Sequence, residues 1–351
     1  MMETKFMFSP KVYGLLYSIC SLVALVVLVC GVMVSLISSG VLGVWVGMEV
    51  NFLGAVCFMS GVYVEESESV MKYFIVQVVG SCFLVLGLLM LVYGEFLLLV
   101  ESFSMMGLAI KLGIFPFHFW VPGVMSSLSW FACFVVSVVQ KVAPLWLLSN
   151  FCLGSGVVNV MELLGILTCL VGCVGGIGML NYRALMGYSS LSHLGFLVIL
   201  CLAEVSLFWS YLVVYGLLNL MLMTSLWSLS IYSYSDLLKE GDVSYYTELV
   251  WISFYFLSLA GIPPFSGIFL KVYFLVSCWS FAPLGCVLCL MGSAVSVYFY
   301  LGVVIDMVVY WGKSTCIMFG KDNSKYISLV GFVSVIVNIG IGYPLFLLCG
   351  T

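Results

Sequence analysis

Four ionisable residues stand alone inside long apolar stretches of this chain, and their chemistry is that of charge or proton transfer. They are Glu49, Lys111, Lys141 and Lys271. Lys271, for example, is the only charged residue between Glu248 and Asp306, although one crossing of a bilayer takes only about 20 residues. A charge held at the centre of a membrane helix costs roughly 2.5–3.5 kcal/mol on insertion scales. The sequence therefore predicts a charge or proton pathway inside a membrane protein.

Lys111 and His118 bracket Pro116. On a continuous helix, a spacing of seven residues places two side chains two turns apart, about 10 Å along one face. A proline between them frees a backbone carbonyl for water, and a lysine and a histidine can pass a proton through such a gap. In the alternative interpretation, Lys111 reaches the membrane surface and His118 bonds to the end of a helix. The depth of Lys111 in its apolar run favours function, whereas both interpretations stay open for His118.

Glu49 requires a cationic partner, because an unpaired carboxylate in hydrocarbon takes up a proton. A lysine on another helix is the natural partner, and Lys111 is the candidate. If the two form an ion pair, a change in the charge of one alters the proton affinity of the other, which is the basis of a pump step. The alternative is a static buried ion pair that only holds the helices together.

Lys141 and Lys271 repeat the combination of a lysine at membrane depth and a nearby proline. Lys141 comes three residues before Pro144, and Lys271 comes seven residues after Pro264. The segment Gly261-Ile262-Pro263-Pro264 interrupts a long apolar run, and two consecutive prolines must break the helix there. A broken helix at membrane depth survives only where it is buried in protein or lines a wet cavity.

The elements that position these residues are membrane helices. Hydrophobic residues make up 64% of the 351 residues and charged residues 7%, compared with about 25% charged in a soluble protein. We therefore expect an all-α polytopic membrane protein with about 10–11 transmembrane helices in a single transmembrane domain. The expected divisions are a tail at 1–12, eight spans within 13–232, a polar loop at 233–248, and the broken helix with the last spans within 249–348.

Three expected boundaries concern the polar residues between spans. The acidic residues 65–68 are predicted to form a loop, the sixth span is predicted at about 157–180, and the last at about 327–348.

Fourteen cysteines lie mostly in apolar stretches and are interpreted as small apolar helix residues. The sequence has no phosphate-binding loop and no thiol cluster for an iron–sulfur centre, so we expect no cofactor in this chain. The net charge of −4 gives no sign of a nucleic-acid partner.

Several segments resemble the antiporter-like subunits of mitochondrial NADH-ubiquinone oxidoreductase, which is respiratory complex I. They are residues 43–51, 111–122, 140–144, 181–195 and 257–271, in family order. The Gln-Lys-x-Ala-Pro motif and the lysine after the double proline favour the chain 2 branch over the larger subunits. The chain departs from the family pattern at Phe115, Gly123 and Gly302.

The resemblance implies roles for the charged residues. Glu49 and Lys111 would form the inner pair, Lys141 the central relay, and Lys271 the element towards the exit. His193, within the fourth motif, joins His118 as a candidate relay of lower weight.

The resemblance also implies a multi-pass protein of the mitochondrial inner membrane. Such a chain moves protons while other subunits bind NADH and ubiquinone and carry the electrons, so its partners are other membrane-arm subunits and the lipid bilayer. Any enzyme activity then belongs to the assembly. Two alternatives stay open: a free-standing secondary cation/proton antiporter, and a subunit whose charges serve only assembly.

Overall fold

The protein is an all-helical bundle in a computed structural model that describes residues 10–61, 63–93, 97–151, 155–238, 243–263, 265–315 and 338. Within these ranges, nine helices are long and apolar enough to cross a membrane, and two shorter apolar helices are also present. The two shorter helices are the halves of the predicted broken span. Except for Asn338, the expected last span at 327–348 lies outside the described residues.

The first half of the bundle ends at Asn150. Its elements are α1 (Pro10–Ile37), α2 (Val41–Met59), α3 (Val64–Tyr93), α4 (Leu97–Leu112), the 3-10 helix η1 (Phe117–Phe119), α5 (Trp120–Met125), α6 (Trp130–Phe134), the π-helical turn η2 (Val135–Val139) and α7 (Gln140–Asn150).

The second half contains the interrupted span. Its elements are α8 (Ser155–Gly175), α9 (Tyr182–Ala203), α10 (Val205–Ser228), the 3-10 helix η3 (Tyr234–Leu238), α11 (Val243–Ala260), α12 (Gly267–Cys278) and α13 (Pro283–Thr315).

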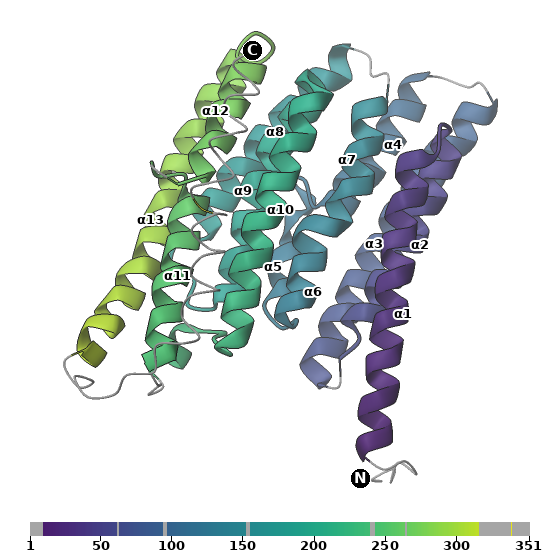
Figure 1. The fold of residues 1–351 in the computed structure, drawn as a ribbon. Helices are drawn as coiled ribbons and strands as arrows, with labels where there is room; N and C mark the ends of the chain where they lie inside the picture. Colours follow the sequence, from purple (N-terminus) through teal and green to yellow (C-terminus); the bar gives the residue numbers. More distant parts are fainter. Residues whose placement is uncertain are drawn as a thin grey trace.

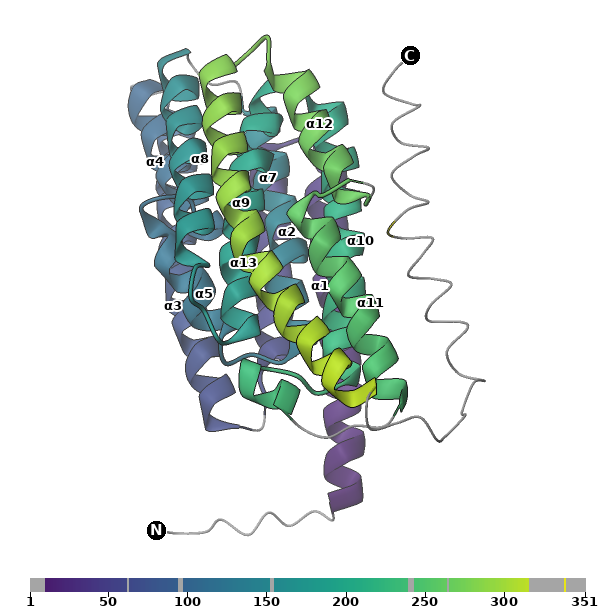
Figure 2. The same cartoon turned by 90° about the vertical axis from the view of Figure 1, so that its left-hand side faces the viewer.

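Helix α9 forms the centre of the bundle. It contacts α7, α8, α10, α12 and α13, and 89% of the most apolar window of its span is buried, against 22% for α1. In Figure 1, α1 and α2 lie at one side, and α12 and α13 at the other, with α9 between them. The turned view shows the long α13 running obliquely across one face of the bundle (Figure 2). A side chain on α9 can therefore contact helices from both sides of the bundle.

The acidic stretch at residues 65–68 is helical, so the predicted loop is wrong there. Helix α3 begins at Val64, and Glu65 and Glu66 stand in its first turn. Carboxylates are favourable in a first turn because the unpaired backbone N–H groups carry partial positive charge. The acidic residues therefore start a helix instead of separating two.

The sixth span is shorter than predicted. Helix α8 ends at Gly175, and α9 begins at Tyr182, where the Asn181 side chain accepts a hydrogen bond of 3.1 Å from the Arg183 backbone N–H. Asparagine is a preferred N-cap because its side-chain oxygen satisfies an otherwise unpaired donor of the first turn. The segment at 181–183 thus starts the seventh span and does not close the sixth.

The polar stretch at 233–248 is only partly a loop. It contains η3 and the beginning of α11, whereas residues 239–242 lie outside the described ranges. The Asp236 carboxylate accepts hydrogen bonds of 2.9 Å from the backbone N–H groups of Tyr232 and Ser233. An isolated antiparallel β-bridge pairs Ser233 with Asn181. This bridge holds the connection before α11 against the start of α9.

Candidate functional site

Glu49 and Lys111 form the predicted ion pair. Lys111 Nζ on α4 donates to Glu49 Oε1 on α2 over 2.6 Å, and the two side chains are 3% and 25% exposed. Two unit charges about 4 Å apart attract by about 4 kcal/mol at an effective dielectric constant of about 20. The structure thus places two opposite charges in direct contact inside the bundle.

Two backbone carbonyls at the end of α4 accept hydrogen bonds from side chains. Helix α4 ends after Leu112, where Gly113 has φ of +78°. Gln77 Nε2 on α3 donates to the Lys111 carbonyl over 3.1 Å, and Trp120 Nε1 donates to the Ile110 carbonyl over 3.2 Å. The carbonyl that Pro116 deprives of a donor is that of Leu112, four residues earlier, so a free carbonyl at that position stays a prediction.

His118 is not joined to Lys111 by helical spacing, because the helix ends between them. His118 lies in η1, where its ring stacks on Phe115 at a centroid distance of 5.8 Å. Its side chain is buried, and Nδ1 has no hydrogen-bond partner among the described residues. His118 and Tyr188 line a cavity of about 410 Å³ between α5 and α8. Because α4 ends at Leu112, the two residues do not share one helical face, and the proton exchange between His118 and Lys111 stays a prediction.

Lys141 is held by a backbone carbonyl. Its Nζ donates to the Ser190 carbonyl on α9 over 2.6 Å, and the residue is 4% exposed. The π-helical turn η2 ends immediately before α7, and Pro144 follows inside α7. Such a wide turn is frequent at functional sites, and it sets the register in which Lys141 faces α9.

Gln140 connects the helix of Lys141 to the helix of Glu49. Its Nε2 donates to the backbone oxygen and to Oδ1 of Asn51 over 3.3 and 3.2 Å. Asn51 is 1% exposed and follows Glu49 by two residues on α2. One amide pair thus joins the ion pair to the central lysine.

His193 lies on α9, one turn beyond the carbonyl that holds Lys141. Its Nδ1 is 2.8 Å from the Tyr211 hydroxyl on α10, and its ring centroid is 4.7 Å from that of Tyr215. Its helix, α9, contacts both α7, which carries Lys141, and α12, which carries Lys271. A relay role for His193 between these helices stays a prediction.

Lys271 lies at the break between α11 and α12. Its Nζ on α12 donates over 2.7 Å to the carbonyl of Ala260, the last residue of α11. A helix C-terminus carries partial negative charge and stabilises an ammonium group. Gly261 has φ of +69°, and a Cβ built there would lie 2.6 Å from Lys271 Cε. The break thus supplies both the carbonyl and the space that Lys271 needs.

The helices that carry these residues contact one another in sequence across the bundle. Helix α7 contacts α2, α4 and α9, and α9 in turn contacts α12. Figure 1 shows the same order from the side of α2 and α4 to the side of α12. We use the name charged row for the set Glu49, Lys111, Lys141, His193 and Lys271.

Sequence reasoning missed the polar residues that bond to the charged row. They are Asn51, Gln77, Gln140, Ser190 and Tyr211. One signal was available, since Gln77 and Gln140 are the only glutamines in the chain and both contact this site. Within the part of the chain that the structure describes, no three His, Cys, Asp or Glu side chains gather to hold a metal ion.

Comparisons with known proteins match this arrangement. The family described as NADH:quinone oxidoreductase/Mrp antiporter, transmembrane, matches residues 92–296, which contain all of the charged row except Glu49. The NADH-ubiquinone oxidoreductase chain 2 of Anopheles gambiae is 30% identical, over 89% of this chain and 94% of its own. That of Branchiostoma lanceolatum is 32% identical, over 83% of this chain and 86% of its own.

A solved structure shares the fold. It is respiratory complex I from Thermus thermophilus with bound aureothin, in which one chain is 20% identical and superposes with a TM-score of 0.75, covering 93% of this chain and 77% of that chain. The predicted antiporter-like fold is therefore confirmed. The chain belongs to the NADH-ubiquinone oxidoreductase chain 2 family, within the NADH:quinone oxidoreductase/Mrp antiporter membrane proteins.

Proposed function

We propose that this subunit moves protons along the charged row while the enzyme that contains it transfers electrons from NADH to ubiquinone. The observation that carries the proposal is Lys141, a buried lysine whose ammonium is bonded to a backbone carbonyl and not to an acid. A lysine that is fixed by a carboxylate is held in the charged state, whereas one bonded to a neutral carbonyl can release its proton at a smaller cost. Lys141 is thus suited to exchange protons with its neighbours.

The Glu49–Lys111 pair controls the proton on Lys141. When the pair is closed, the positive charge of Lys111 is compensated over the 2.6 Å contact. When it opens, the uncompensated ammonium repels a proton on Lys141, because like charges disfavour each other in a low dielectric. Opening of the pair therefore drives a proton away from α4 and towards α9.

His193 and Lys271 receive that proton on the other side of the bundle. The contact between His193 and the Tyr211 hydroxyl orients the imidazole ring, and the remaining ring nitrogen is left to exchange a proton. The Ala260 carbonyl then stabilises the protonated Lys271 at the end of α11. Release occurs when Lys271 leaves this carbonyl, at the break between α11 and α12.

The chain works within a larger assembly in the mitochondrial inner membrane. We expect NADH and ubiquinone to bind to other subunits and this chain to carry no redox cofactor of its own. Its lateral surface is apolar, as on α1, where Leu22, Val26 and Val29 are 63%, 55% and 56% exposed. Such a surface contacts either lipid or the neighbouring membrane-arm subunits.

Substitution of Lys141 by arginine tests the relay directly. Arginine keeps the positive charge but does not release a proton in proteins, so a purely structural charge would tolerate it. We expect Lys141→Arg and Lys141→Met to assemble, and both to lower the number of protons moved per electron pair in reconstituted vesicles. Lys72→Met is the matched control, because Lys72 is 60% exposed and pairs only with Glu68 on the surface.

The outcome separates the three interpretations of the charges. An assembled Lys141→Arg enzyme that pumps at the full ratio would refute the relay and leave a structural role. An active complex I-sized assembly in mild detergent is expected for the native chain. A small assembly that exchanges cations for protons by itself would instead support the free-standing antiporter.

A further inference from the structure

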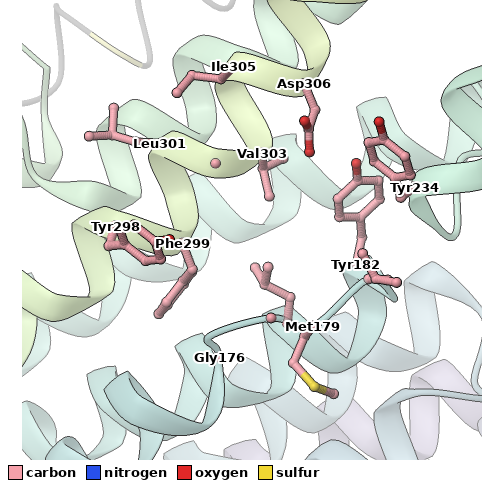
Figure 3. A pocket seen from close by; sticks show the side chains of 14 residues that line it. Gly176, Met179, Tyr182, Tyr234, Tyr298, Phe299, Leu301, Val303, Ile305 and Asp306 are labelled. Atoms are coloured by element: carbon pink, nitrogen blue, oxygen red, sulfur yellow. The ribbon is translucent and has the colours of Figure 1, made fainter.

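A cavity of about 430 Å³ opens on the side of the bundle away from the Glu49–Lys111 pair. It lies between α13, η3 and the connection from α8 to α9, and Figure 3 shows the side chains that line it. None of its lining residues belongs to the charged row. It is therefore a separate site, and the proposed function does not use it.

The cavity lies at the depth of lipid head groups. The apolar span of α8 ends at Gly175, and that of α9 begins at Tyr182. The cavity is lined by the connection between these two ends, by the beginning of α9 and by residues 298–306 of α13. It thus opens beside a connection between two spans, where the hydrocarbon region gives way to water.

The lining combines one negative charge with aromatic rings. Asp306 is the only charged residue among the lining residues that the structure describes. The rings of Tyr182 and Tyr234 lie beside it, whereas Tyr298 lies at the other end of the cavity (Figure 3). In Figure 3, the Asp306 carboxylate points to the side of the cavity where Tyr182 and Tyr234 lie. A carboxylate flanked by aromatic rings favours an organic cation, through charge and through cation–π attraction.

The mouth of the cavity is apolar and open. A Cβ built on Gly302 would meet nothing within 4 Å, so this position leaves space beside Asp306, which follows one helical turn later. On the same helix, Tyr298 and Ile305 are 70% and 59% exposed. A ligand that matches this lining therefore has a cationic head group and an apolar part.

We propose that this cavity binds the head group of phosphatidylethanolamine. The primary ammonium donates to the Asp306 carboxylate between the tyrosine rings, and the acyl chains follow the apolar face of α13. A choline head lacks N–H donors and binds more weakly. An anionic phosphatidylglycerol head meets a carboxylate and no Lys or Arg among the described lining residues, so it is disfavoured.

Photo-crosslinking to the purified native complex tests the site. The complex is incorporated into lipid nanodiscs that contain a small fraction of phosphatidylethanolamine with a photoreactive group beside the amine. Labelled peptides are then mapped by mass spectrometry. We expect labelling within 176–182 and 298–306. Asp306→Asn should reduce it on the order of tenfold, because the amide still accepts a hydrogen bond from the ammonium but the ionic contribution is lost. Gly302→Arg should have the same effect, since it fills the cavity and places a guanidinium one turn from Asp306.

Glu162→Gln is the matched control, because Glu162 is a partly buried carboxylate on α8 that does not line the cavity. It should leave the labelling unchanged. Unreduced NADH–ubiquinone reductase activity in all three variants would show that the assembly is intact. Equal labelling by matched ethanolamine, choline and glycerol probes, unaffected by Asp306→Asn, would overturn the proposal. Crosslinks from Asp306 to a lysine or arginine of a neighbouring subunit, with no lipid labelling, would also overturn it.

Discussion

Gln140 donates its side-chain amide to both oxygens of Asn51, at 3.3 Å to the backbone and 3.2 Å to Oδ1. Asn51 stands half a turn beyond Glu49, and Gln140 immediately precedes Lys141. The bond thus joins the helix of the ion pair to the helix of the central lysine. In the proposed mechanism, movement of α2 on opening of the ion pair would reach α7 through this polar contact.

Replacement of either amide by leucine should disturb proton transfer. Loss of one partner leaves the other buried and unsatisfied, which costs about 1–3 kcal/mol. Asn51→Leu and Gln140→Leu should each lower the pumping ratio more than they lower assembly. The double variant should lose less than the sum of the two single losses, because both remove the same bond. Strictly additive losses in ratio would show that the two residues do not act together.

Glu49→Gln should destabilise the subunit and slow the enzyme. The change leaves the Lys111 ammonium, 3% exposed, without a counter-charge, and breaking a buried pair from one side costs about 3–5 kcal/mol. Thermal melting of the purified assembly and its NADH–ubiquinone reductase rate would measure the two effects.

The double variant Glu49→Gln with Lys111→Met separates stability from function. Removal of both charges should restore the melting temperature towards the native value, since no unpaired charge remains. Pumping should stay low. Recovery of both properties together would argue that the pair serves only packing.

Gly261→Ala should impair the enzyme more than Gly178→Ala does. Both glycines have positive φ, +69° and +79°, so alanine costs roughly 1–2 kcal/mol of backbone strain at either position. Only at Gly261 would the new Cβ collide with Lys271, whereas nothing lies within 4 Å at Gly178. The collision should displace Lys271 from the Ala260 carbonyl and reduce the proton-to-electron ratio. Equal ratios in the two variants would contradict a role for this contact.

The two histidines provide a matched pair of variants. His193→Gln should lower pumping, because its helix contacts the helices of both Lys141 and Lys271, and Tyr211→Phe should lower it less by removing only the orienting contact. His118→Gln should leave the ratio unchanged, since the ring contacts described for His118 are with Phe115 and Phe119. Proton uptake by vesicles during NADH oxidation provides the measurement. A larger loss in His118→Gln than in His193→Gln would reverse the assignment.

Much of the fold could be predicted because the bilayer imposes a simple rule on sequence. A membrane helix must be apolar for about 20 residues, so the runs between polar residues revealed the spans and the prolines revealed the broken helix. The errors fell at residues 65–68 and 181–183, where polar side chains start helices. Polar residues mark both loops and helix N-termini, and only the backbone geometry tells one from the other.

The sequence by itself determined the helical bundle, the break at the double proline and the identity of four charged members of the charged row. These follow from composition and local spacing, because a lone charge in an apolar run is costly wherever the chain folds. Only the tertiary structure decided the partners: Asn51 for Gln140, Ser190 for Lys141, Tyr211 for His193 and the Ala260 carbonyl for Lys271. The first two contacts join residues 89 and 49 positions apart, and no local pattern encodes which helices will meet. The spacing of His118 from Lys111 was likewise uninformative, because it has meaning only on a continuous helix and α4 ends at Leu112.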